Sequence, residues 1–462
     1  MTTGLQHFRA KKIGILGFGA EGKALLDFFL KHDIIPSVYD VKEQVREFLP
    51  PNFKGEFVCG AAYLDSLDQI DIVFRSPGIP RGIQKLLEAE KKGVEISSAT
   101  KLFFELCRGQ IIGVTGTKGK GTTATLIYEI LRAGKKEAYL GGNIGAVLLD
   151  QLSTIDDKTF VVLELSSFQL EDLDVSPHYA VVLGIMPEHL DHHQSAENYF
   201  SAKSNIVAHQ TPKDRVVLCA DNQITKRLAT GIASKKYWVS TQSIAEPGGY
   251  QVGGQLCFNL DGREEIICQT DELQLAGKHN WQNVLAAVVI ARLAGVDIAH
   301  IRQAVLNFRG LPHRLQIVGT YNGVTYVNDS LSTIPESAIA AIETFLAPKI
   351  MILGGSEKFS NYRDLARKIA ASNVRAVFLI GQTSPKIKKA LQDAEYSGVI
   401  SDDIDNLQDI VRGASSIANR GDVVLLSPAS ASFGLFKDYA DRGRQFEQAV
   451  KKLIEHDETG QT

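Results

Sequence analysis

A glycine-rich segment with a lysine offers the clearest chemistry in the sequence. It runs Gly113-Val114-Thr115-Gly116-Thr117-Lys118-Gly119-Lys120-Gly121-Thr122-Thr123, between an apolar run (GQIIGV) and a helical pattern. Glycines let a backbone wrap a phosphate chain, and N–H groups at the helix start then face the anion. Lys120 can reach the β and γ phosphates, and a hydroxyl at the helix start can bind Mg²⁺. A glycine-rich turn without a ligand is the alternative. The predicted loop for ATP comprises Gly116, Thr117, Lys118, Gly119, Lys120, Gly121, Thr122 and Thr123.

Acidic and basic side chains follow the next apolar runs. Glu164 ends the run FVVLE, and a carboxylate beside a phosphate loop is a natural Mg²⁺ ligand; a helix cap is the alternative. Ser166 and Gln169 lie near it and could orient a substrate. His189 follows the run YAVVLGIM and could bind a second metal ion, or a loop carbonyl could hold it. Lys203, taken alone, is predicted to lie on a helix surface.

Two further patterns indicate nucleotide binding. Asn280 and Asn283 in GKHNWQN would share one helix face, where their amides could pair with an adenine edge or form a polar helix start. Near the N-terminus, GFGAEG follows the run KKIGIL, and Asp40 ends the next run, SVYD. Alone, this is a dinucleotide fingerprint, so a nicotinamide oxidoreductase is an alternative. A second nucleotide loop beginning at Gly113 favours another function for the whole chain.

The elements that position these residues alternate along the chain. Short β-branched runs, typical of strands buried in parallel sheets, alternate with amphipathic helical patterns, which predicts α/β architecture. Breaks near residues 108–109 and 309–312 divide the chain into three domains, 1–108, 109–310 and 311–462. We expect a Rossmann-like first domain, a P-loop ATPase-like central domain and a Rossmann-like third domain. A glycine-rich alternating segment at about residues 240–270 predicts a β-hairpin insertion.

Composition narrows the class of protein. A chain of 462 residues is too long for a single hydrophobic core. Its net charge of −3 gives no excess of basic residues for binding nucleic acid. No apolar run approaches the roughly 18 residues that a membrane span needs, and the N-terminus lacks a signal-peptide pattern. The five cysteines are scattered, which favours free thiols over a zinc site or disulfides. We expect a cytoplasmic protein that binds neither membrane nor nucleic acid.

The order of the motifs resembles the Mur ligase family over nearly the whole chain. The glycine loop is followed by LELSSFQL, GKHNWQN, LPHR, NDS and LLSPASAS, and LELSSFQLE with SPASAS resembles the glutamate-adding members. The resemblance implies an ATP-dependent ligase of peptidoglycan precursor synthesis, acting as a monomer. Such an enzyme joins glutamate to UDP-N-acetylmuramoyl-L-alanine through an acyl phosphate.

The resemblance also implies roles for individual residues. The first domain would bind the UDP group, and Asn143 in GGNIG would face the nucleotide-sugar with Ser166 and Gln169. Two Mg²⁺ ions would lie near Thr122, Glu164, His189 and a carbamylated Lys203, with Thr117 assisting. Asn280, Asn283, Arg314 and Asp329 would contact ATP, and Lys120, Glu164, His189, Lys203 and Arg314 would be catalytic. The UDP group would contact Gly19, Ala20, Glu21, Asp40 and Gly78, and glutamate would contact Thr333, Lys358, Ser432 and Tyr439.

Three departures from the family pattern keep alternatives open. Leu331 stands where the glutamate-adding enzymes have lysine, so L-glutamate is an alternative to the favoured D-glutamate. Gly121 resembles folylpolyglutamate synthases, which makes a ligase of that kind a second alternative. Pro187 and Glu188 alter the expected residues before His189. A non-catalytic nucleotide-binding protein is the alternative from another class.

Overall fold

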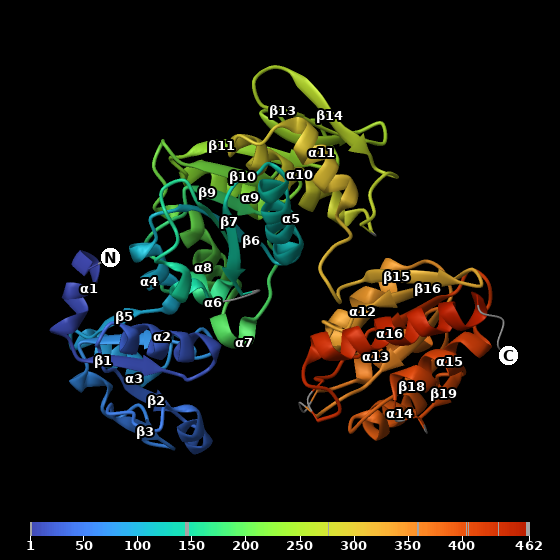
Figure 1. Ribbon diagram of the computed structural model, residues 1–462, viewed down its shortest axis with the longest axis horizontal. Helices are drawn as coiled ribbons and strands as arrows, with labels where there is room; N and C mark the ends of the chain where they lie inside the picture. The colour runs from blue at the N-terminus through green and yellow to red at the C-terminus, as the bar shows by residue number, and fades with distance from the viewer. Residues whose placement is uncertain are drawn as a thin grey trace. The chain divides into compact units, whose positions relative to one another are not determined.

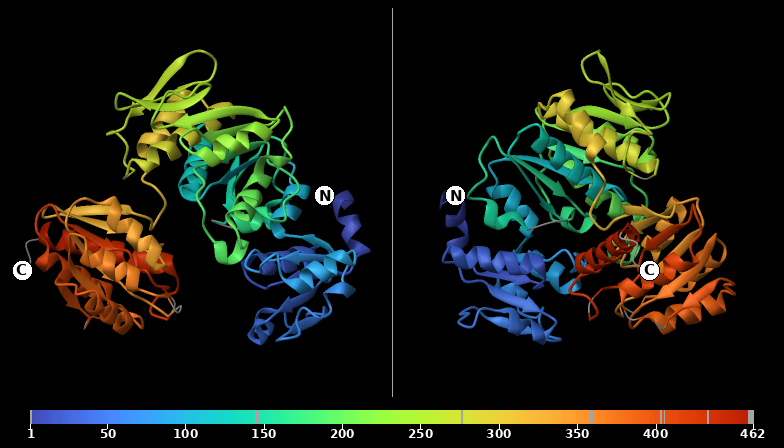
Figure 2. Two further views of the ribbon diagram at one scale, coloured as in Figure 1. Left: turned by 180° about the vertical axis from the view of Figure 1, so that it is seen from behind. Right: turned by 45° about the vertical axis from the view of Figure 1, so that its right-hand side comes forward.

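The computed structural model contains three mainly parallel sheets with helices packed against them (Figures 1 and 2). It describes residues 2–143, 147–275, 277–357, 360–402, 404, 406–432 and 434–458. The chain forms two compact units, the first Met1–Leu273 with Lys278–Phe308 and the second Gln274–Gly277 with Arg309–Thr462. The sheets confirm the predicted α/β class with Rossmann-like first and last sheets.

The first sheet has five parallel strands in the order β3-β2-β1-β4-β5. Its central strands β1 and β4 are buried along their whole length, as the continuous apolar runs predicted. The carboxyl ends of β1, β2 and β4 carry the glycine loop, Asp40 and Arg75. The strands are β1 (Ile13–Leu16), β2 (Ser37–Asp40), β3 (Phe57–Cys59), β4 (Ile72–Arg75) and β5 (Glu95–Ser97).

The second sheet has nine strands in the order β14-β13-β12-β11-β10-β9-β6-β8-β7. The predicted hairpin segment is antiparallel, but it forms two successive hairpins and joins the sheet through β11, so it extends the sheet instead of standing apart from it. The strands are β6 (Gln110–Thr115), β7 (Ala138–Gly142), β8 (Phe160–Glu164), β9 (Tyr179–Val182), β10 (Arg215–Cys219), β11 (Lys235–Ser240), β12 (Gly248–Val252), β13 (Gln255–Asn259) and β14 (Glu264–Gln269).

The third sheet, in the second unit, has six strands in the order β15-β16-β20-β17-β18-β19. Only β15 is antiparallel to its neighbour, at the edge. The strands are β15 (Gln316–Tyr321), β16 (Val324–Asn328), β17 (Lys349–Leu353), β18 (Val374–Leu379), β19 (Val399–Ser401) and β20 (Val423–Leu426).

Helices connect the strands and cover the sheets. None of the described helices is both long and apolar enough to cross a bilayer. The α-helices are α1 (Thr2–Arg9), α2 (Ala20–Lys31), α3 (Gln84–Lys91), α4 (Ala99–Leu106), α5 (Lys120–Ala133), α6 (Ser167–Leu170), α7 (Leu190–His193), α8 (Ala196–Ala208), α9 (Gln223–Leu228), α10 (His279–Leu293), α11 (Ile298–Asn307), α12 (Pro335–Thr344), α13 (Arg363–Ala370), α14 (Ser384–Asp393), α15 (Leu407–Ile417) and α16 (Tyr439–Glu458). The 3-10 helices are η1 (Glu43–Phe48), η2 (Leu67–Gln69), η3 (Leu148–Gln151) and η4 (Ala229–Gly231).

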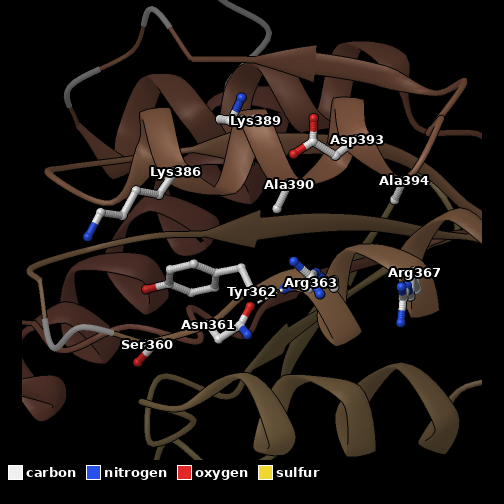
Figure 3. A pocket seen from close by; sticks show the side chains of 10 residues that line it. All are labelled: Ser360, Asn361, Tyr362, Arg363, Arg367, Lys386, Lys389, Ala390, Asp393 and Ala394. Atoms are coloured by element: carbon white, nitrogen blue, oxygen red, sulfur yellow. Dashed lines mark hydrogen bonds between the residues drawn. The ribbon is translucent and has the colours of Figure 1, made fainter.

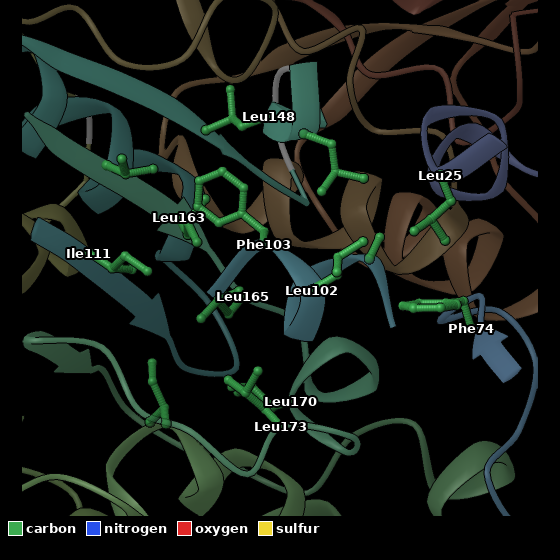
Figure 4. Packing of buried hydrophobic residues seen from close by; sticks show 14 of the residues in the cluster. Leu25, Phe74, Leu102, Phe103, Ile111, Leu148, Leu163, Leu165, Leu170 and Leu173 are labelled. Atoms are coloured by element: carbon green, nitrogen blue, oxygen red, sulfur yellow. The ribbon is translucent and has the colours of Figure 1, made fainter. Parts of the chain in front are cut away.

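One hydrophobic cluster joins the first two sheets into a single unit. Leu25 and Phe74 of the first sheet's layer pack in the same buried cluster as Leu102 on α4 and Leu163 on β8 (Figure 4). A shared core of this kind makes the two sheets one packed body. The domain boundaries at residues 108–109 and 310–311 stay predictions, although the second unit resumes at Arg309.

Candidate functional site

The glycine loop lies between β6 and the start of α5, as a phosphate loop requires. Gly119 precedes the helix with φ +86°, and an added Cβ would lie 2.2 Å from Asn283 Oδ1, so only glycine fits. Lys120 Nζ donates to Thr117 O at 3.1 Å, which folds the lysine over the loop. Lys118 is exposed, whereas Thr122 and Thr123 are buried at the first turn of α5.

Thr117 has a structural task that the sequence did not indicate. Its Oγ1 donates to Met186 O at 3.0 Å, accepts from Met186 N at 2.9 Å and lies 3.0 Å from Tyr199 Oη. These contacts occupy the hydroxyl, so its assistance at a metal ion would need them to break. Thr122 remains the hydroxyl at the helix start that suits a cation.

Glu164 ends β8 next to the loop, because Val114 of β6 pairs with it in register. Its side chain is buried at 5% exposure. Oε1 accepts from Asn143 Nδ2 at 3.1 Å, while Oε2 is buried with no hydrogen-bond partner among the described residues. An unsatisfied buried carboxylate oxygen is costly, and a bound cation would remove that cost. The donor set therefore fits Mg²⁺ at Glu164.

Lys203 is buried and does not lie on the helix surface, the position that the residue taken alone would suggest. It is 1% exposed on α8, where the fold turns this face of the helix toward β6. Nζ donates to Gly116 O at 2.9 Å and to Thr115 Oγ1 at 3.3 Å, and lies 4.9 Å from the Tyr199 ring centroid. Burial, followed by the charge of Lys120, lowers the pKa of Lys203 to about 7. A substantial fraction of the amine is then neutral and nucleophilic near neutral pH.

The histidines after β9 have different environments. His189 has φ +56° and a side chain 47% exposed, 3.7 Å from Glu188 Oε2. His193 is buried, with Nε2 2.9 Å from Ser167 Oγ, and burial lowers its pKa to about 4. In the part of the chain that the structure describes, no three His, Cys, Asp or Glu side chains gather as a metal cluster. Glu164 and His189 therefore do not form a closed metal site by themselves.

Asn280 and Asn283 lie at the start of α10 and are buried against the glycine loop. Asn283 Nδ2 donates to Asn280 Oδ1 at 2.8 Å. The predicted shared face is confirmed by this bond. One amide lies in contact with Gly119, so the pair supports the loop directly.

The predicted residues for the UDP group lie around the first glycine loop. Gly19 and Ala20 are exposed at the start of α2 and Gly78 is exposed in the loop after β4; an added Cβ would meet open space at either glycine. Asp40 accepts from Phe18 N at 2.8 Å, so its carboxylate holds the loop. Glu21 reaches across to the central sheet.

The Glu21 contact joins two predicted substrate residues. Gln169 Nε2 donates to Glu21 Oε1 at 2.8 Å, and Gln169 Oε1 accepts from Ser166 N at 3.1 Å in a capping box. Burial raises the pKa of Glu21. The side chains of Ser166 and Gln169 therefore stabilise the start of α6, the segment that follows Glu164.

In the second unit, Asp329 follows β16 and is buried. Its carboxylate accepts from Leu315 N at 3.1 Å, Ser332 Oγ at 2.5 Å and Ser427 Oγ at 2.6 Å. Burial outweighs these bonds and raises the pKa of Asp329 to about 6. The carboxylate ties the loops after β16 and β20, while Arg314 is exposed beside them. Contact of Asp329 with a ribose stays a prediction.

Three of the predicted glutamate residues lie on the same loops or at the helix that follows them. Ser432 is buried, Thr333 is half-buried and Tyr439 is 42% exposed at the start of α16. Lys358 lies outside the described residues. A residue that the sequence did not indicate, Arg442, is fully buried and donates to Ser330 Oγ at 2.9 Å and Ser430 O at 3.0 Å. It holds the two loops together, a role that could not be predicted from a single arginine in a helical segment.

A cavity of about 520 Å³ lies in the second unit between α13 and α14. Figure 3 shows its lining side chains, those of α13 on one side and those of α14 on the other. Of the predicted glutamate residues that the structure describes, Thr333, Ser432 and Tyr439, none lines it. Tyr362 connects it to the site, since its hydroxyl lies 2.9 Å from Ser430 Oγ. The lining residues are Ser360, Asn361, Tyr362, Arg363, Arg367, Lys386, Lys389, Ala390, Asp393 and Ala394.

Comparison with family models accounts for all three sheets. Residues 11–98 match "Mur ligase MurD-like, N-terminal domain", residues 114–291 match "Mur ligase middle domain" and residues 313–430 match "Mur ligase, glutamate ligase domain". The UDP-N-acetylmuramoylalanine--D-glutamate ligase of Acetivibrio thermocellus is 38% identical over 98% of this chain and 100% of its own. The ligase of that name from Symbiobacterium thermophilum is 38% identical over 96% of this chain and 98% of its own.

Solved structures share the fold at low sequence identity. MurF from Acinetobacter baumannii has a TM-score of 0.59 at 16% identity, with 98% of each chain covered. UDP-N-acetylmuramate-alanine ligase MurC from Thermotoga maritima has a TM-score of 0.55 at 17% identity, with 96% of this chain and 100% of its own covered. These similarities show that the chain shares its fold with these structures.

Proposed function

Because the chain belongs to the Mur ligase family, we propose that it joins D-glutamate to UDP-N-acetylmuramoyl-L-alanine with ATP, in peptidoglycan precursor synthesis. The observation that carries the proposal is the β6–α5 loop, beside which Glu164 and Lys203 lie buried. Relatives that carry this ligase name align over nearly the full chain.

The reaction needs an activated carboxylate, because a free carboxylate is a poor electrophile. The γ-phosphoryl group of ATP would pass to the terminal carboxylate of UDP-N-acetylmuramoyl-L-alanine, giving an acyl phosphate and ADP. The amine of glutamate would then attack the acyl carbon, an amide would form and phosphate would leave. Lys120 would neutralise charge on the transferred group, and Arg314 would add a second cation on domain closure.

Magnesium ions would offset phosphoryl charge when bound. Glu164 Oε2, which has no partner in the described part of the chain, and the hydroxyl of Thr122 suit one ion. For a second ion, His189 and Lys203 are the proposed ligands, and Lys203 must first become anionic. Its buried amine would react with CO₂, lose a proton and form a carbamate, a step that its lowered pKa favours.

The amino-acid side would be formed by the loops that Asp329 and Arg442 hold. Thr333, Ser432 and Tyr439 lie on these loops or at the helix that follows them, and Lys358 would complete the site. We propose that the enzyme acts as a cytoplasmic monomer, a state that size-exclusion chromatography with light scattering would test.

The deciding experiment measures phosphate release with ATP, UDP-N-acetylmuramoyl-L-alanine and a panel of D- and L-amino acids. D-glutamate should be consumed selectively when both isomers are present at equal concentration, and chiral analysis of the hydrolysed product would identify the isomer. An exclusive L-glutamate product would establish the alternative that Leu331 keeps open. Product with neither isomer would refute the glutamate assignment. Activity with a folate substrate instead would favour the other ligase class, against which the match of residues 11–98 argues.

A further inference from the structure

Arg75 is a buried cation to which no motif assigns a role. It ends β4, directly before the Ser76-Pro77-Gly78 loop, and its side chain is 0% exposed. A buried guanidinium without partners would be very costly. Its partners therefore show what the side chain does.

The guanidinium of Arg75 connects loops that follow strands of two different sheets. Nη1 donates to Ile79 O, within the loop after β4. Nε donates to Asp172 Oδ2 at 2.8 Å, and Nη2 donates to Phe168 O at 3.1 Å. Nη2 also lies 3.2 Å from Glu171 Oε2. The last three partners belong to α6 and the turn after it, which follow β8.

The two carboxylates in this cluster have further partners. Asp172 Oδ1 lies 3.2 Å from Arg81 Nε, and Glu171 Oε1 lies 2.9 Å from His193 Nδ1. The cluster pairs Arg75 and Arg81 with Glu171 and Asp172, and Arg81 also pairs with the exposed Glu90; Arg75 and Asp172 are almost inaccessible to water. Geometry held by several buried charged bonds is stiff, because no single partner can leave without exposing another unpaired charge.

Both ends of this connection carry residues of the proposed substrate site. The loop after β4 contains Gly78, expected to contact the UDP group, and α6 contains Gln169, expected to face the nucleotide-sugar. Gln169 also bonds Glu21 on α2, so a second contact joins the same two sheets. A substrate that spans both sheets reacts well only if the separation of its two binding loops is correct, and a 1 Å error can cost about 100-fold in rate.

We infer that Arg75 is a positioning residue that sets the spacing between the uridine-binding loop and the segment after Glu164. The inference rests on the proposed function and deepens it. The residue touches no reacting atom. It acts by holding the two loops at the separation that one nucleotide-sugar needs in order to bind both.

The test compares Arg75→Gln and Asp172→Asn with a matched control, Lys101→Gln. Lys101 on α4 forms an ion pair at 2.8 Å with Asp174, so it also joins the first sheet's layer to the segment after α6. Asp174 lies two residues beyond Asp172, but among the described residues Lys101 forms no hydrogen bond or ion pair with Arg75, with Asp172 or with the loop after β4. Circular dichroism and thermal unfolding of the full-length chains check folding. Asp172→Asn keeps the side-chain shape, so it is the variant to rely on if Arg75→Gln does not fold.

The expected result is a KM for UDP-N-acetylmuramoyl-L-alanine raised by about tenfold in both cluster variants, an effect typical of coupled contacts. The KM for glutamate should stay within about twofold, because the glutamate residues lie in the second unit. Calorimetric binding of the nucleotide-sugar without ATP should weaken in parallel, and Lys101→Gln should match the wild type.

Two outcomes would overturn the inference separately from the proposed function. Folded cluster variants that bind the nucleotide-sugar as tightly as the wild type would remove the positioning role. A loss of kcat with unchanged KM, matched by Lys101→Gln, would reduce Arg75 to a general stability contact. A wild-type enzyme that neither binds UDP-N-acetylmuramoyl-L-alanine nor turns it over would overturn the proposed function, and this inference with it.

Discussion

Replacing Glu164 by glutamine should lower activity while leaving the metal-free fold as stable as before, or more stable. The substitution keeps the side-chain shape and the acceptor for Asn143, which lies 3.1 Å away. It replaces Oε2, which is buried without a hydrogen-bond partner among the described residues, by a neutral amide group. A neutral unsatisfied group costs less to bury than a charged one, by about 1 kcal/mol or more. For a unit of this size, 1 kcal/mol corresponds to about 2 °C in melting temperature.

Catalysis should change in the opposite direction. If Glu164 holds Mg²⁺, its loss should reduce kcat by at least about 100-fold, since even outer-shell partners of metal ions are worth 10–100-fold. Added Mg²⁺ with ADP should also stabilise the wild type more than the variant, because ligands that bind only the folded state stabilise it.

The assay pairs thermal unfolding in EDTA, and in Mg²⁺ with ADP, with phosphate release at saturating substrates. The control is Asp156→Asn, because Oδ1 of that exposed carboxylate accepts from Lys158 N at 3.0 Å and from Thr159 Oγ1 at 2.7 Å, away from the loop. The control should lose stability and keep its kcat. If Glu164→Gln instead loses stability and keeps activity, Glu164 is only a structural cap, and the metal assignment fails.

Three other predictions follow from the same geometry. Lys120→Ala should fold normally and lose ligation almost entirely; near-normal turnover in phosphate release would contradict the phosphate-loop assignment. Lys203→Ala should be inactive and largely rescued by formate, which can replace a carbamate oxygen; an active variant without formate, together with an unmodified Lys203 by mass spectrometry in bicarbonate, would remove the carbamate from the mechanism. The pKa of Asp329 rises from 3.8 to about 6 in the folded protein, so the folded state binds protons more tightly between these values. Stability of the second unit should therefore fall as pH rises from about 4 to about 6, and hydrogen exchange of β16 and β20 should show no such slope in Asp329→Asn. Equal slopes in wild type and variant would exclude Asp329 as the origin.

Local sequence patterns determine many of the helices, strands and loops of this protein. The strand at Ile13–Leu16, the loop before Lys120 and the helix from His279 each depend on nearby residues: apolar runs, glycines and a polar helix start. The glycine-rich turn between a strand and a helix, which is the candidate phosphate loop at residues 116–123, could therefore be predicted. The motif order also identified the family that the comparisons show.

Only the tertiary structure decided which polar groups are buried and with whom they pair. Lys203, taken alone, has the pattern of a surface lysine, but the packing of α8 buries it. The sequence gives no indication that the Thr117 hydroxyl bonds Met186. Arg75 and Asp172 are 97 residues apart in the sequence, so no local pattern could predict their contact. Burial and long-range pairing arise when sheets and helices pack, and these alone set the cost of a charge, its pKa and its partners.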